Sequence, residues 1–263
     1  MLLTIDIGNT HITLGAFKGD DIQFVSRLAT DRERTQDQYA IELNDIFLLY
    51  NISPKNFQGA AISSVVPELS AEIINAVTML IRKKPLLLTP GIKTGVNILT
   101  DNPAQVGGDL IAGTVAANNL YPLPCIVADL GTATKVSAID ENGSFLGCAI
   151  APGVAISVEA LSSRTSQLPR FSFETPPRSI GKNTIESMQS GIVFGTAAMI
   201  DGICDRFEQE FGKKFKTIVA TGGLSKDITK NCRHKIIYNG ELLLYGLKVI
   251  YEMNLKKTKQ SDN

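Results

Sequence analysis

The sequence predicts an α/β protein made of two similar units, each with a mixed sheet flanked by helices. The main observation is a duplicated motif, in which a hydrophobic strand ends in Asp, one apolar residue, Gly and a nearby Thr. It occurs at residues 3–10 and again at residues 127–134, and a second strand-like run follows each copy. Helical patterns separate the remaining strands, as in other α/β folds. The duplication predicts two domains whose turns face one cleft.

Both turns have the composition of a phosphate-binding site. The motif residues are Asp6, Gly8 and Thr10 in the first copy and Asp129, Gly131 and Thr132 in the second. Each glycine lacks a Cβ and can adopt positive φ, so phosphate oxygens can reach backbone N–H groups. Each threonine adds a hydroxyl donor. Each carboxylate repels phosphate and is expected to act through a cation. The alternative, that these residues only shape hairpin turns, is less favoured because the motif occurs twice.

Composition argues against several classes of protein. The 26 Lys+Arg residues balance 26 Asp+Glu residues, and the pI is about 6.7, so nothing marks a binder of nucleic acid or anionic membranes. We expect no signal peptide and no membrane-spanning segment. The four cysteines are far apart without a C-x-x-C pair, and only two histidines are present, so a zinc site is not expected. This cysteine usage fits a reducing cytoplasm.

The first domain is expected over residues 1–120. Strand patterns occur at residues 2–5, 11–17, 22–28, 59–65 and 86–89. Apolar residues recur at helical spacing over residues 35–50, where Thr35 is a candidate N-cap, and again from Pro67 to residue 81. Gly107 and Gly108 open a third helix that runs to about residue 119.

The second domain is expected over residues 121–255, followed by a disordered tail at residues 256–263. Strand patterns occur at residues 125–130, 135–139, 145–150 and 217–220. Helices are expected from Gly153 to about residue 163, over residues 185–211 and over residues 241–254. Residues 165–183 carry three prolines and are expected to form a long loop. Loops of this length in compact proteins usually have a function or contact a partner.

The chain resembles the actin and sugar-kinase superfamily, and within it the type III pantothenate kinases, a group that includes the Bvg accessory factors. The residues that carry the resemblance are Asp6-Ile7-Gly8-Asn9-Thr10, Ser64-Val65-Val66-Pro67, Gly107-Gly108-Asp109, Asp129-Leu130-Gly131-Thr132-Ala133-Thr134, Ala151-Pro152-Gly153, Leu168-Pro169, Ile180-Gly181-Lys182-Asn183-Thr184, Ser190-Gly191, Thr221-Gly222-Gly223 and Tyr245-Gly246-Leu247. The resemblance implies two ribonuclease H-like (actin-like ATPase) domains with the active site in the cleft between them. It also implies ATP-dependent phosphorylation of pantothenate to 4'-phosphopantothenate, the first step of coenzyme A biosynthesis.

The resemblance further implies cofactors, partners and site residues. The cofactors are ATP, Mg²⁺ and a monovalent cation, K⁺ or NH₄⁺, and the protein is a cytoplasmic homodimer. Asp109 is the catalytic proton acceptor, Asp129 binds the monovalent cation, and Asp6 holds Mg²⁺ through water. The expected ATP-binding residues are Asp6, Ile7, Gly8, Asn9, Thr10, His11, Ile12, Thr13 and Thr132. The expected substrate-binding residues are Thr100, Gly107, Gly108, Asp109, Leu110 and Thr184, the last reaching the site of the neighbouring subunit.

General chemistry supports the role of Asp109, since a carboxylate at a helix start can accept a hydrogen bond from an attacking hydroxyl. A plain N-cap is the alternative for this residue taken alone.

Four positions depart from the family pattern. Leu110 stands where Arg is usual, Thr100 where Tyr is usual, Lys135 where Thr is usual, and Cys148 where Gly is usual. Two interpretations of Lys135 stay open. Its ammonium partly replaces the charge missing at position 110, or it is a solvated strand residue.

Two other functions remain as alternatives. One is a catalytically weakened or inactive dimeric protein with a regulatory or binding role, and the other is a kinase for another small hydroxy substrate. The chain has no G-x-x-x-x-G-K-[ST], G-x-G-x-x-G or G-x-S-x-G motif, which argues against P-loop, dinucleotide-binding and α/β-hydrolase proteins.

Overall fold

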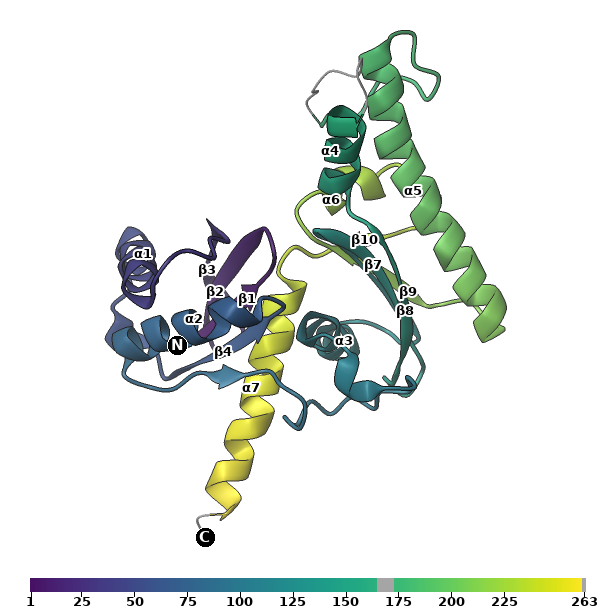
Figure 1. Cartoon of the computed structure of the whole chain (residues 1–263). Helices are drawn as coiled ribbons and strands as arrows, with labels where there is room; N and C mark the ends of the chain where they lie inside the picture. Colours follow the sequence, from purple (N-terminus) through teal and green to yellow (C-terminus); the bar gives the residue numbers. More distant parts are fainter. Residues whose placement is uncertain (165–172, 262–263) are drawn as a thin grey trace. The chain divides into compact units, whose positions relative to one another are not determined.

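The computed structural model describes residues 1–164 and 173–261 (Figure 1). The chain divides into two compact units. The first contains residues 1–96, 102–116 and those from 241 onward, and the second contains residues 97–101 and 117–240. The expected sequence boundaries differ from this division mainly at the C-terminus, where the last helix belongs to the first unit. Within the described ranges, no helix is both long and apolar enough to cross a membrane.

The first unit contains a five-stranded mixed sheet in the order β3-β2-β1-β4-β5. Its strands are β1 (Leu2–Ile7), β2 (His11–Lys18), β3 (Asp21–Ala29), β4 (Gly59–Ser64) and β5 (Leu86–Leu87). The central strand β1 pairs antiparallel with β2 and parallel with β4. In this register Asp6 lies opposite Thr13 on β2 and opposite Ser63 on β4.

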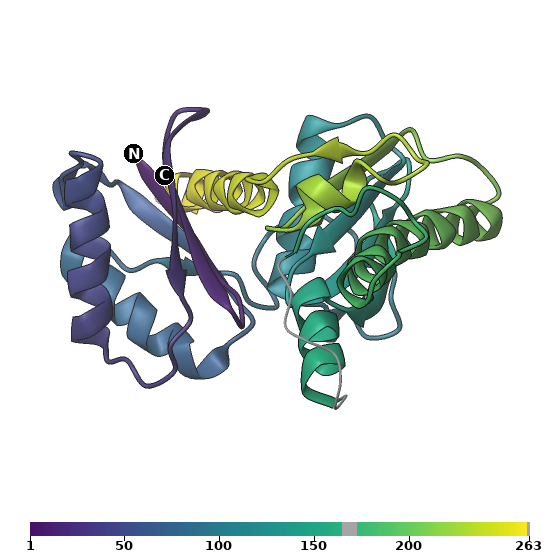
Figure 2. The same ribbon diagram turned by 90° about the horizontal axis from the view of Figure 1, so that it is seen from above.

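Helices cover both faces of this sheet. They are α1 (Gln36–Leu49), α2 (Pro67–Ile81), α3 (Gly108–Leu120, in this unit through residue 116) and α7 (Leu242–Ser261), with 3₁₀ turns η1 (Pro54–Asn56) and η2 (Pro103–Gln105). Leu3, Ile5 and Ile7 are fully buried in the core that α1 and α2 complete. On the other face, Leu244 of α7 packs against Leu2 and Phe17, and Figure 2 shows α7 in yellow on the opposite side of the sheet from α1 and α2.

The second unit repeats the sheet topology of the first. Its strands are β6 (Cys125–Leu130), β7 (Ala133–Ile139), β8 (Phe145–Pro152), β9 (Thr217–Thr221) and β10 (Ile237–Tyr238), in the order β10-β9-β6-β7-β8. As in the first unit, the central strand pairs antiparallel with the next strand of the chain and parallel with the fourth strand of its unit. Helices α4 (Val154–Arg164), α5 (Thr184–Phe211) and α6 (Ser225–Thr229) contribute to the core on one face of this sheet. The expected α/β fold of two mixed sheets flanked by helices is confirmed.

One detail differs from the sequence expectations and another agrees with them. Helix α7 runs to Ser261 and so includes most of the segment expected as a disordered tail; residues 262 and 263 lie outside the described residues. Thr35 does cap α1, and it forms a complete capping box with Gln38. The motif Leu168-Pro169, with the first part of the proline-containing loop, also lies outside the described residues.

Candidate active site

One candidate carboxylate and the helix start that carries a second adjoin the same serine in the first unit. Asp6 is the penultimate residue of β1, and its fully buried neighbours Ile5 and Ile7 point to the α1–α2 face. Because side chains alternate along a strand, Asp6 points to the other face, together with its cross-strand partner Ser63. Asp109 follows Gly108 at the start of α3. A Cβ placed on Gly108 would lie 3.1 Å from the hydroxyl oxygen of Ser63. Asp6 and the start of α3 therefore both adjoin Ser63.

The Ser63 hydroxyl is the feature that the sequence analysis missed. Its side chain is fully buried, and Oγ has no hydrogen-bond partner among the residues that the structure describes. Buried polar atoms in native proteins are nearly always paired, so an orphan hydroxyl next to Asp6 and the start of α3 indicates a position for a ligand or an ordered water. The only local signal was a pair of serines at the end of an apolar strand.

Asp109 is largely shielded from solvent, with 9% of its surface exposed. It occupies the second position of α3, and its Oδ1 accepts a hydrogen bond from the backbone N–H of Leu110 at 2.8 Å. This geometry differs from a plain N-cap, where the side chain precedes the helix and accepts from the N–H two or three residues later. The positive end of the helix dipole favours a carboxylate here.

The first motif turn is held by its own backbone and by the segment after β3. The N–H of Gly8 donates to the carbonyl of His11 at 3.0 Å, and Thr30 Oγ1 donates to the carbonyl of Gly8 at 2.6 Å. Arg32 donates to the side-chain carbonyl of Asn9 at 2.9 Å. The sequence did not indicate these two supporting residues. Neither Gly8 nor Gly131 is among the described glycines with positive φ, so that expected reason for glycine is wrong at both positions. The other expected reason was the missing Cβ, and at Gly8 a Cβ would lie only 3.0 Å from the carbonyl oxygen of His11.

Two of the expected ATP-binding residues belong to the core. The side chains of Ile7 and Ile12 are fully buried, so only their backbone atoms can contact a nucleotide. His11 is exposed at the start of β2 and Thr13 is half-buried.

The second motif turn is supported by a close backbone approach. The N–H of Gly131 donates to the carbonyl of Ala133 at 3.2 Å. Gly153, at the end of β8, lies so near this turn that a Cβ on it would collide with the backbone carbonyl oxygens of Gly131 and Thr132. Glycine is thus required at position 153 to let the two backbone segments touch.

The third carboxylate, Asp129, forms an ion pair. Lys135 Nζ lies 2.8 Å from Asp129 Oδ2, and the two side chains are 17% and 13% exposed. The residues are directly opposite each other in the β6–β7 hairpin. Lys135 is therefore not a solvated strand residue. The positive charge of Lys135 is balanced by Asp129. Lys135 is therefore a weak substitute for the arginine that the family usually has at position 110.

The remaining expected site residues are divided between the two units. Asp6, the residues through Thr13 and residues 107–110 lie in the first unit, whereas Thr100, Asp129, Thr132 and Thr184 lie in the second. Thr100 is half-buried, and its hydroxyl finds no hydrogen-bond partner in the described part of the chain. Thr184 is an exposed first residue of α5, next to the N-cap Asn183.

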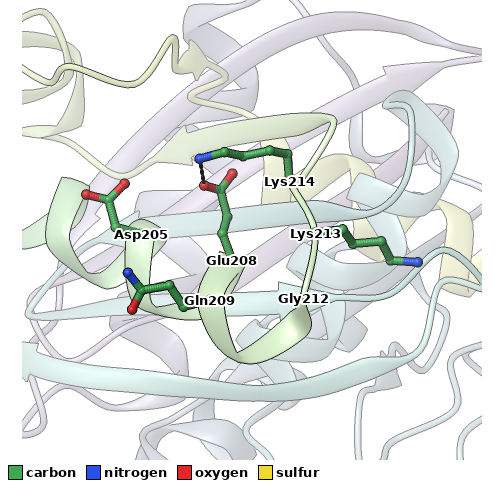
Figure 3. A pocket seen from close by; sticks show the side chains of 6 residues that line it. All are labelled: Asp205, Glu208, Gln209, Gly212, Lys213 and Lys214. Atoms are coloured by element: carbon green, nitrogen blue, oxygen red, sulfur yellow. Dashed lines mark hydrogen bonds and ion pairs between the residues drawn. The ribbon is translucent and has the colours of Figure 1, made fainter.

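A hollow at the C-terminal end of α5 lies apart in sequence from every motif residue. Its lining residues are Asp205, Glu208, Gln209, Gly212, Lys213 and Lys214 (Figure 3). Glu208 pairs with Lys214, and Asp205 pairs with His234 at 2.8 Å and Arg233 at 2.9 Å. Hydrogen bonds from His234 and then Arg233 lower the pKa of the Asp205 carboxyl. These groups already balance one another, and an acidic cluster of this kind is a structural ion-pair network.

Comparison with known proteins identifies relatives along nearly the whole chain. Residues 2–206 match the family model described as type III pantothenate kinase. A relative named type III pantothenate kinase from Moorella thermoacetica is 43% identical over 256 residues, which cover 97% of this chain and 100% of the relative. Among solved structures, a Baf family protein from Campylobacter jejuni has a TM-score of 0.62 at 20% identity, covering 97% of this chain and 99% of that one. The ROK hexokinase from Thermus thermophilus has a TM-score of 0.56 at 12% identity, again covering 97% and 99%. These two structures show a shared fold.

Proposed function

The chain belongs to the type III pantothenate kinase family and transfers a phosphoryl group from ATP to pantothenate, and we propose that Asp109 accepts the proton of the attacking hydroxyl. The new bond joins the primary hydroxyl oxygen of pantothenate to the γ-phosphorus, and the bond to the β–γ bridging oxygen breaks. The products are 4'-phosphopantothenate and ADP. Such transfers depend on positioning and on charge stabilisation more than on covalent catalysis.

Three properties of Asp109 support this role. Its carboxylate is nearly buried, it lies in the first turn of a helix, and one of its oxygens is oriented by the N–H of Leu110. A positioned carboxylate of this kind contributes by general base catalysis. The adjoining orphan hydroxyl of Ser63 is the observation that carries the proposal, because it indicates that a polar ligand completes this site.

ATP and a divalent metal follow from the family, and the residues at Asp6 fit Mg²⁺. A carboxylate and a hydroxyl on neighbouring strands supply the oxygen atoms that Mg²⁺ and its bound waters prefer. When bound, Mg²⁺ neutralises charge on the transferring phosphates. Asp6 would hold it through water, and Ser63 would hydrogen-bond to that water. The phosphates would contact the first motif turn at residues 8–13 and the hydroxyl of Thr132. Because the N–H of Gly8 already donates to the carbonyl of His11, other groups of the turn would make these contacts.

A monovalent cation, K⁺ or NH₄⁺, does not fit the residues at Asp129. The ammonium of Lys135 already contacts this carboxylate at 2.8 Å. We therefore assign no step to a bound monovalent cation.

Two departures from the family pattern affect the substrate side. The side chain of Leu110 cannot donate a hydrogen bond, and the loss of one charge-assisted hydrogen bond costs about 1.5–3 kcal/mol. This weakens catalysis without abolishing it. Thr100 lacks the aromatic ring and the phenol of the tyrosine that the family usually has at this position. We further propose that the enzyme is a cytoplasmic homodimer in which Thr184 reaches the active site of the neighbouring subunit.

Product identification tests the proposal directly. The protein is incubated with Mg·ATP and pantothenate, and the products are identified by mass spectrometry. We expect 4'-phosphopantothenate and an equal amount of ADP. Phosphorylation of another small hydroxy acid in a parallel panel, with none of pantothenate, would assign the enzyme to a different substrate. Absence of turnover from folded protein across the panel would favour the regulatory alternative.

A further inference from the structure

We infer that Lys135 supplies, from within the chain, the positive charge that a monovalent cation would bring to Asp129, so that the enzyme works without K⁺ or NH₄⁺. The inference deepens the proposed function and rests on it for its catalytic consequence. The ion pair on which it is based does not depend on that function.

The strand register places the two charges together. Asp129 on β6 and Lys135 on β7 are cross-strand partners in an antiparallel hairpin, so their side chains share one face of the sheet. Nζ and Oδ2 are 2.8 Å apart, which is the distance of a charge-assisted hydrogen bond. The turn at Gly131 and Thr132 joins the two strands directly. The positive charge is therefore fixed at the base of the second motif turn.

Burial makes this pair hard to exchange for a metal ion. More than four-fifths of each side chain is shielded from water. An entering cation would have to displace the ammonium and leave Lys135 charged in a site with little solvent, which is strongly unfavourable. A tethered ammonium also loses no translational freedom when it binds, whereas a free ion does. By contrast, the pair of Lys213 with Glu141 is about half exposed and is an ordinary surface contact.

The duplicated fold provides an internal comparison. Asp6 and Asp129 occupy equivalent positions on the central strands β1 and β6, each opposite a residue of the following strand. That residue is Thr13 in the first unit and Lys135 in the second. Threonine carries no charge, so this cross-strand partner brings no cation to Asp6. In the second unit the neutralising charge belongs to the protein.

The test uses the wild-type protein, Lys135→Thr and the control Lys213→Met. Lys135→Thr places a threonine opposite Asp129, as Thr13 stands opposite Asp6 in the first unit. Lys213→Met removes a lysine from an exposed ion pair in the same unit as Lys135. Mg·ATP affinity, unfolding temperature and pantothenate-dependent turnover are each measured in KCl, NH₄Cl and choline chloride at one ionic strength.

For the wild type and for Lys213→Met, we expect the Mg·ATP affinity, the unfolding temperature and the turnover each to be the same in all three salts. For Lys135→Thr, we expect K⁺ to improve Mg·ATP affinity by about 5- to 150-fold over choline and to raise the unfolding temperature. Wild-type protein that binds Mg·ATP or turns over only with K⁺ or NH₄⁺ would overturn the inference while leaving the kinase assignment intact. So would a wild-type unfolding temperature that rises with K⁺ but not with choline. If pantothenate is not phosphorylated in any salt, the proposed function fails, and affinity and unfolding still decide the role of Lys135. The wild-type measurements decide it even if Lys135→Thr does not fold.

Discussion

Ser63 lies directly opposite Asp6 in the parallel pairing of β1 with β4, and the start of α3 adjoins the same serine. This arrangement relates two carboxylates that are about a hundred residues apart in the sequence. We propose that Asp6 holds the metal and that Asp109 accepts the proton of the substrate hydroxyl. These roles fit their positions, since Asp6 lies on β1 and Asp109 at the start of α3, the two elements that adjoin Ser63.

Replacing Ser63 should impair Mg·ATP binding without lowering the stability of the fold. Because its hydroxyl bonds to no residue of the described chain, we expect Ser63→Ala to raise the KM for Mg·ATP without lowering the free energy of unfolding. The neighbouring Ser64 is the matched control, since its hydroxyl donates to the carbonyl of Val66 and accepts from Ser70. Ser64→Ala should cost about 1 kcal/mol of unfolding free energy. Urea unfolding and steady-state kinetics measure both, and equal destabilisation by the two changes would contradict this account of Ser63.

Gly153→Ala should disturb the second motif turn. The added methyl would collide with the carbonyl oxygens of Gly131 and Thr132, so we expect a loss of about 1–3 kcal/mol of unfolding free energy and weaker Mg·ATP binding. Gly202→Ala within α5 is the control. Its Cβ would meet no described atom within 4 Å, and alanine favours a helix over glycine by about 1 kcal/mol. An unchanged melting temperature for Gly153→Ala would contradict this prediction, because it would mean that the turn shifts to accept the methyl group without loss of stability.

The four cysteines should differ in reactivity. All are free thiols, with Cys148 exposed on β8 and Cys125 and Cys204 buried. Burial raises the pKa of Cys125 and of Cys204 to about 12. At pH 8 these two are almost entirely protonated as well as inaccessible, and alkylation requires the thiolate. Mass spectrometry after brief iodoacetamide treatment should find Cys148 labelled and these two unlabelled until urea is added. Early labelling of Cys204 would contradict the packing of α5.

Mixed dimers test whether Thr184 acts on the neighbouring subunit. Asp109→Asn and Thr184→Ala proteins are each expected to be impaired alone. If Thr184 reaches the other subunit, a mixed dimer has one site with both native residues and regains activity. If Thr184 serves its own subunit, neither site is intact and activity stays low. The readout is ADP release after the two proteins are unfolded and refolded together, compared with each refolded separately.

The local parts of the fold followed from the sequence. Both motif hairpins and helix α1 with its Thr35 cap depend on residues that are neighbours in the chain, so their patterns were sufficient. The register of the second hairpin places Lys135 opposite Asp129, which the sequence analysis did not state. The ion pair could have been predicted from that spacing.

The long-range parts did not follow. The role of Ser63 depends on the parallel pairing of β1 with β4, which are separated by more than forty residues and two other strands. The return of α7 to the first unit depends on Leu244 meeting Leu2 and Phe17, and on close contact between Gly246 and the backbone of Ala112. Apolar periodicity identified α7 as a helix but carried no information about which sheet it would cover.

Pantothenate-dependent release of ADP from Mg·ATP, compared between the wild type and Asp109→Asn, tests the central claim most directly. We expect wild-type turnover to depend on pantothenate and to fall by about 10²- to 10⁴-fold in Asp109→Asn, with Mg·ATP affinity unchanged. The variant keeps the size of the side chain, so loss of activity with retained binding would identify Asp109 as the proton acceptor. Turnover by Asp109→Asn at the wild-type rate would contradict that assignment.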